Sequence, residues 1–143
     1  PKLIEAAAKA HQFLTFTTPP NLQKAVAFGL AKDVAYFKSL GTDMQVKRDR
    51  LKDGLTEIGF EVMDGQGTYF LATDFRPLGF NGDDVEFCKH LTIEAGVGAV
   101  PFSAFYQGGL ASGVSHFARF CFCKQDDLLD EALDRLAKHF GGV

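Results

Sequence analysis

The sequence predicts an α+β fold, with a small, mostly antiparallel sheet and helices packed on one side of it. Two observations predict this arrangement: runs with helical periodicity occupy both ends of the 143-residue chain, and short apolar runs separated by glycine-containing turns lie between them. Hydrophobic residues make up 46% of the chain and charged residues 23%, which is typical of a chain that folds. The length suits one domain with a hydrophobic core.

The first part of the chain is predicted to be mainly helical. Residues Lys2 to His11 are rich in Ala, Lys, Glu and Leu, which favour helix. Residues Phe13 to Thr18 are aromatic and β-branched, and we expect them to be extended. Thr18, followed by two prolines, is an N-cap candidate for a long helix. Apolar residues at helical spacing continue on both sides of Gly41, which either kinks one helix or separates two.

The middle of the chain combines strands with a helix. Two apolar runs, Phe60 to Met63 and Thr68 to Thr73, are separated by Asp-Gly-Gln-Gly, which predicts a hairpin. The Gly65-x-Gly67 pattern lacks the third glycine of a dinucleotide-binding fingerprint and is interpreted as a turn. Asp83 is then expected to cap a helix that ends at Gly96, and Val97 to Val100 is another strand candidate.

The end of the chain is predicted to be a strand followed by an amphipathic helix. Alternation in residues 116–123 places Phe117, Arg119, Cys121 and Cys123 on one face of the strand, with Phe120 and Phe122 on the other. Acidic residues at the start of the helix and basic residues at its end suit the helix dipole. Its predicted buried stripe is Leu128, Ala132, Leu136 and Phe140.

Arg119 is the strongest functional candidate. A guanidinium on a strand of aromatic and cysteine residues is unfavourable to bury without an anionic partner. Its planar set of donors suits a carboxylate held by two parallel hydrogen bonds. The alternatives are an internal salt bridge to one of the 18 acidic residues, or a position on the solvent side of an edge strand.

Other side chains point less clearly to chemistry. The four histidines are scattered, with no serine or cysteine nucleophile at a recognisable spacing, so core or surface roles are expected. For the aromatic side chains of the loop from Pro101 to Gly109 we favour core or loop packing over contact with a ligand. The three cysteines are expected to be reduced, buried thiols of a cytoplasmic protein, and no residue spacing suggests a metal site. The net charge of -3 and the absence of a long apolar segment predict neither nucleic-acid nor membrane binding.

Four segments taken together resemble the class I/II aminotransferases, in particular the kynurenine/glutamine and methionine aminotransferases. They are HQFLTFTTP at residues 11–19, followed by Gln23, then GTYFL at 67–71, VPFSAFY at 100–106 and RFCFCK at 119–124, before an amphipathic terminal helix. The resemblance spans essentially the whole chain. It implies the small domain of a fold-type I enzyme that uses pyridoxal 5'-phosphate, forms a homodimer, and acts on amino acids and 2-oxo acids.

The resemblance also implies roles for particular residues. Arg119 would hold the α-carboxylate of the substrate, and Phe16 would lie in a loop that reaches the substrate pocket of the neighbouring subunit. Thr17 stands where some kynurenine-active members carry histidine, which bears on side-chain preference. Tyr69 would line the pocket more distantly. These four residues are the substrate-binding candidates, whereas no catalytic, cofactor-binding or metal-binding residue is assigned in this chain.

None of the lysines lies in the Ser-x-x-Lys-like context in which the family carries its Schiff-base lysine. The chain also begins at Pro1 without an initiator Met. We therefore expect residues 1–143 to be the C-terminal small domain, with an interdomain helix region over about residues 1–58 and the large cofactor-binding domain absent. Such a chain would be inactive by itself. Two alternatives remain: a carbon–sulfur lyase of the same fold, and a non-catalytic binding or dimerisation module.

Overall fold

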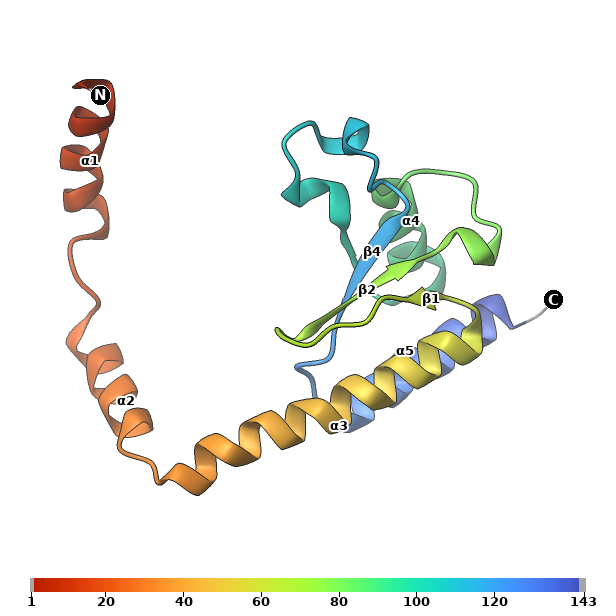
Figure 1. The fold of residues 1–143 in the computed structure, drawn as a ribbon, viewed down its shortest axis with the longest axis horizontal. Helices are drawn as coiled ribbons and strands as arrows, with labels where there is room; N and C mark the ends of the chain where they lie inside the picture. Colours follow the sequence, from red (N-terminus) through yellow and green to blue (C-terminus); the bar gives the residue numbers. More distant parts are fainter. Residues whose placement is uncertain (1, 142–143) are drawn as a thin grey trace. The chain divides into compact units, whose positions relative to one another are not determined.

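The computed structural model describes residues 2–141 and divides the chain into two compact units. The first unit ends at Ser39 and the second begins at Leu40. The first contains helices α1 (Lys2–Thr15) and α2 (Pro20–Leu30), coloured red and orange in Figure 1. Helix α3 (Val34–Ile58) begins in the first unit and continues through the second.

The helix boundaries of the first unit differ from those expected. The prediction of extended chain is wrong for Phe13 to Thr15, which form the last turn of α1. The Thr15 hydroxyl donates to the His11 carbonyl at 3.1 Å, which helps a β-branched residue to remain helical. Helix α2 begins at Pro20, with Pro19 rather than Thr18 at the N-cap and no side-chain cap, because a proline at N1 needs no partner for its nitrogen.

The break between the two long helices lies at residues 31–33, ahead of Gly41. The carboxylate of Asp33 accepts a hydrogen bond from the Tyr36 amide at 3.0 Å and so caps the start of α3. Gly41 lies inside α3, so it does not separate two helices. A capping carboxylate determined this boundary, and one helical glycine was not enough to create another.

The second unit is built on a four-stranded antiparallel sheet with the order β1-β2-β4-β3. Its strands are β1 (Glu61–Val62), β2 (Phe70–Asp74), β3 (Val100–Pro101) and β4 (Phe117–Cys121). The predicted hairpin is confirmed as β1 and β2. The strand candidate Val97 to Val100 is reduced to Val100 and Pro101, because only these two residues pair with β4.

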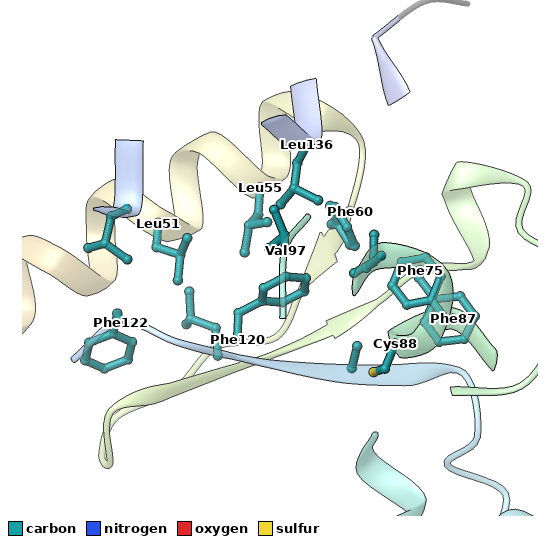
Figure 2. Packing of buried hydrophobic residues seen from close by; sticks show 14 residues of the cluster. Leu51, Leu55, Phe60, Phe75, Phe87, Cys88, Val97, Phe120, Phe122 and Leu136 are labelled. Carbon is teal, nitrogen blue, oxygen red and sulfur yellow. The ribbon is translucent and has the colours of Figure 1, made fainter. Parts of the chain in front are cut away.

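The hydrophobic core lies on one face of this sheet, against three helices, as the predicted fold class requires. Leu71 of β2 pairs with Phe120 of β4, and both side chains are buried. They pack against Leu51 and Leu55 of α3, Phe87 and Cys88 of α4 (Asp84–His90), and Leu129 and Leu136 of α5 (Asp126–Phe140), as Figure 2 shows for most of these residues. Leu128 was expected in the buried stripe of α5, but it is half exposed and Leu129 is buried instead. The other three residues of the predicted stripe, Ala132, Leu136 and Phe140, do pack in or against the core, so the prediction fails only at its first residue.

Helix α4 begins with a capping box formed by Asp83 and Glu86, which confirms the predicted N-cap. A π-helical turn (Leu91–Ala95) continues it, and Gly96 in the left-handed conformation ends it. Of the three cysteines, Cys88 is buried, Cys121 is only partly buried, and Cys123, beyond the end of β4, is exposed. The expectation of buried thiols is therefore confirmed for Cys88 and wrong for Cys123. Burial, together with the charge of Asp84, raises the pKa of the Cys88 thiol to about 12. No helix within residues 2–141 is long and apolar enough to cross a membrane.

Candidate functional site

Strand β4 directs Arg119 to the face of the sheet opposite the core. Its neighbours Ala118 and Phe120 are buried in the core, and alternation along the strand turns Arg119 the other way. Across the sheet, Arg119 pairs with Ala72 of β2 on one side and Val100 of β3 on the other. Because β4 lies between β2 and β3, Arg119 is on a central strand rather than an edge strand. Its side chain is half-buried, and the small Ala72 side chain leaves room beside the guanidinium.

Two aromatic rings hold the Arg119 guanidinium. Its Cζ lies 4.0 Å from the ring centroid of Phe70 and 4.3 Å from that of Phe105. Both distances are within the range of cation–π attraction. Because the planar guanidinium also stacks well on aromatic faces, the two rings restrain its orientation. Its N–H groups point outward in the guanidinium plane, so an anion approaching edge-on can accept two parallel hydrogen bonds.

No acidic side chain within residues 2–141 lies at ion-pair distance from Arg119, and its guanidinium makes no hydrogen bond there. Other arginines of the second unit are paired: Arg50 with Asp130, Arg76 with Asp74, and Arg135 with Glu131. The internal salt bridge considered from the sequence is therefore not seen in the described part of the chain. The N–H donors of the Arg119 guanidinium are therefore available to a group outside the described part of the chain.

Arg119 lines a cavity of about 490 Å³ on this face of the sheet. The hairpin loop supplies one wall, and the loop after β3 supplies aromatic side chains on another. The lining residues are Met63, Asp64, Gly65, Gly67, Thr68, Phe70, Ala72, Phe102, Phe105, Tyr106 and Arg119. One cationic group in a mainly apolar and aromatic hollow is suited to a small organic anion.

Asp64 is the acidic residue of this lining, and Lys52 binds its carboxylate at 2.6 Å. The hydrogen bond and the charge of Lys52 lower the pKa of the Asp64 carboxyl. Asp64 is therefore ionised and already paired, on the solvent side of the cavity. It does not neutralise Arg119.

The four predicted substrate-binding residues do not all meet at this cavity. Tyr69 is half exposed and lies beside the lining, with its ring centroid 4.6 Å from that of Phe70. Phe16 and Thr17 belong to the first unit, between α1 and α2, and both are exposed. Phe16 has a positive φ of 37°, an uncommon conformation for an aromatic residue. Of the four, Arg119 lines the cavity.

The structure adds Phe70 and Phe105 to the site. Phe70 pairs with Cys121, two residues along β4 from Arg119, so its ring reaches the guanidinium diagonally across the strands. Such contacts depend on the strand register, which the sequence did not specify. For Phe105, Phe102 and Tyr106, packing within the protein was favoured: Phe102 does pack against Tyr106, and all three residues also line the cavity. The clustering of aromatic residues in one loop was the sequence signal that could have identified this wall of the cavity.

A second cavity, of about 340 Å³, lies between α5 and the sheet. Arg135, one of its cationic residues, is bonded to Glu131 and to the Gly96 carbonyl. None of the predicted site residues lines this cavity. The cavity at Arg119 is therefore the better candidate for a binding site.

Comparison with known proteins places this geometry in context. The family model for aminotransferase class I and II matches residues 1–136. The solved structure of N-succinyldiaminopimelate aminotransferase from Mycobacterium tuberculosis superposes with a TM-score of 0.81 at 45% identity, covering 96% of this chain and 35% of that one. A methionine aminotransferase structure from Escherichia coli has a TM-score of 0.76 at 36% identity, covering 91% of this chain and 33% of that one.

A curated relative gives the same coverage. The kynurenine–oxoglutarate transaminase of Dictyostelium discoideum is 37% identical over 155 residues, which cover 95% of this chain and 35% of that protein. The chain thus spans about a third of the length of the relatives it matches.

Proposed function

Because the chain belongs to the class I and II aminotransferases, we propose that it is the small-domain part of an enzyme that transfers an amino group from an amino acid to a 2-oxo acid. In this proposal residues 1–143 form the C-terminal small domain, including an interdomain helix region over about residues 1–58, and the large cofactor-binding domain lies outside them. The three terminal residues 1, 142 and 143 lie outside the described structure. The coverage of the relatives, about a third of their length, supports the proposal.

The surface of the first unit also supports it. Helices α1 and α2 contain no buried residue, and they carry large apolar side chains that are mostly exposed, among them Leu3, Ile4, Phe13, Leu14 and Phe28. Self-sufficient soluble domains rarely expose so many apolar side chains in one segment. We infer that this surface is covered by the rest of the protein or by a second subunit. The proposal therefore includes assembly as a homodimer. It also includes a cytoplasmic location, which the three free cysteines favour.

The observation that carries the proposed function is the guanidinium of Arg119, which has no ion-pair partner within residues 2–141 and contacts the rings of Phe70 and Phe105 in its cavity. We propose that Arg119 binds the α-carboxylate of the substrate edge-on through two hydrogen bonds. Holding the carboxylate fixes the direction of the Cα–H bond that must break, a positioning effect that accelerates the reaction. Phe16 and Thr17 would reach the substrate pocket of the neighbouring subunit. Tyr69 would line the pocket at Arg119 more distantly, beside Phe70.

The family implies pyridoxal 5'-phosphate as the cofactor. The cofactor supplies the electron sink for breaking the Cα–H bond. The residues that line the cavity fit the substrate side of such a site, because they offer a guanidinium and aromatic rings. The lining contains no lysine for a covalent link, so the cofactor-holding residues are expected outside this chain.

The test is the variant Arg119→Lys in the natural gene product that contains this chain. Lysine keeps the charge but loses the planar pair of donors, so we expect kcat/KM for an amino-acid donor to fall about 10- to 100-fold. Arg50→Lys is the matched control, because Arg50 forms an exposed pair with Asp130 away from the cavity. An unchanged kcat/KM in Arg119→Lys would overturn the assigned role.

Turnover of the amino-acid donor, measured with and without a 2-oxo acid, separates transamination from the lyase alternative. A transaminase needs a 2-oxo acid to complete its cycle, whereas a lyase releases product without one. The 143-residue chain supplied with pyridoxal phosphate is expected to show no turnover by itself.

A further inference from the structure

We propose that Asp84 and Ser103 form a positioning pair that holds Phe105 against the guanidinium of Arg119 and so controls how tightly the substrate carboxylate is bound. The inference rests on the proposed role of Arg119. Neither residue lines the cavity, and neither was singled out from the sequence. Their effect would pass through the loop that follows β3.

The two side chains form a buried, fully bonded unit. Asp84 has no exposed surface and Ser103 is 3% exposed. Carboxylate Oδ2 of Asp84 accepts from the Ser103 amide at 2.6 Å, and Oδ1 accepts from the Ser103 hydroxyl at 2.9 Å. No cationic side chain within residues 2–141 lies at ion-pair distance from Asp84. Burying a carboxylate without a cation is unfavourable unless hydrogen bonds replace its lost hydration, and both donors that the structure gives Asp84 come from Ser103.

What the pair holds is the single helical turn η3 (Phe102–Phe105), to which Ser103 belongs. Asp84 lies in the first turn of α4, which is anchored in the core by Phe87 and Cys88. The pair therefore ties an irregular loop to a rigid helix. It acts on both the backbone and the side chain of the same residue, so it restrains the position of the turn and also its rotation.

Phe105 depends on this restraint because its ring has little support of its own. It is 60% exposed, and the guanidinium of Arg119 is the charged group that it covers, at 4.3 Å. Phe70, the other ring in contact with Arg119, is instead fixed by its place in β2. Without the Asp84–Ser103 pair, the loop would move and one of the two rings that orient the guanidinium would be lost. The donors of Arg119 would then point in a less defined direction.

The experiment uses the natural gene product with its cofactor and the variants Asp84→Asn and Ser103→Ala. The readouts are KM and kcat for an amino-acid donor, and the inhibition constant of 3-phenylpropionate, a carboxylate without an amino group. We expect KM and the inhibition constant to rise about tenfold with kcat changed less than threefold, because carboxylate binding is weakened and the chemical groups remain. Leu129→Ala is the control for lost stability, since Leu129 is buried on the other side of the sheet and should lower Tm without changing the inhibition constant.

A second set of variants tests whether the pair acts through Phe105. In a Phe105→Ala background, Asp84→Asn should change the inhibition constant less than twofold. An equal effect of Asp84→Asn with and without Phe105 would overturn the inference, as would wild-type inhibition in both single variants. If Asp84→Asn does not fold, Ser103→Ala, which keeps the amide hydrogen bond, is compared in the two backgrounds instead.

The result for Arg119→Lys separates this inference from the proposed function. If Arg119→Lys raises the inhibition constant and the Asp84 and Ser103 variants do not, only the positioning role fails. If Arg119→Lys leaves the inhibition constant unchanged, the proposed function fails, and the inference fails with it.

Discussion

At the scale of single residues, Thr68 is the least favourable backbone position of the cavity wall. It has a positive φ of 64°, which is rare for a β-branched side chain. Its hydroxyl accepts a hydrogen bond from the Phe70 amide at 3.2 Å, so the side chain helps to hold the start of β2. The conformation places the loop next to Phe70 and the cavity at a cost in stability.

Asparagine should suit this position better than threonine. Its side chain accepts the same hydrogen bond from a residue two positions ahead, and it tolerates positive φ. We expect Thr68→Asn to raise the free energy of unfolding by about 0.5–1 kcal/mol in urea denaturation. Thr68→Ala, which loses the hydrogen bond and keeps the strain, should lower it. A less stable Thr68→Asn variant would contradict this account of the loop.

At the scale of secondary-structure elements, the close approach of α3 and α5 depends on Gly54. A Cβ atom at this position would lie 2.6 Å from both Cδ atoms of Leu133 on α5. Gly41, in the same helix, has no atom within 4 Å of the corresponding point. The two glycines therefore separate the effect of helix propensity from the effect of packing.

Alanine should have opposite effects at these positions. We expect Gly54→Ala to destabilise the chain by about 1 kcal/mol, because Leu133 must move or the helices must separate. Gly41→Ala should stabilise it by about 0.5–1 kcal/mol through helix propensity. Thermal unfolding measures both. Adding Leu133→Ala should remove the penalty of Gly54→Ala, and independent, additive effects would show that contact with Leu133 is not its cause.

At the scale of the whole molecule, the apolar surface of the first unit predicts self-association of the isolated chain. The side chains of Phe13 and Leu14 are about four-fifths exposed, at 79% and 84%. Burial of such surface is the main driving force for association. We expect sedimentation velocity to show a sedimentation coefficient that rises with concentration.

Charged substitutions locate the surface responsible. Leu14→Glu should weaken self-association, because it places a charge among the apolar side chains of α1. Ile93→Glu is the matched control, since Ile93 is 76% exposed but lies in the second unit. A chain that stays monomeric at every concentration would favour a self-sufficient module over a part of a larger enzyme.

The sequence by itself determined the features that depend on neighbours along the chain. Alternation around Arg119 predicted which residues of β4 share a face, and the glycine-containing turn predicted the β1–β2 hairpin. The N-cap at Asp83 was also predicted, because its hydrogen bonds join residues within one turn. The order of four short segments pointed to the family, which the match over residues 1–136 bears out.

Only the tertiary structure decided the features that join distant parts of the chain. Phe70 and Phe105 reach Arg119 from different segments, and Asp84 reaches Ser103 across 19 positions. The same holds for the start of α5, where Leu129 is buried in place of Leu128. Periodicity reports which residues share a face, but strand register and helix packing decide which faces meet. The sequence could therefore single out Arg119 as a candidate binding residue, whereas only the fold could show how its guanidinium is held.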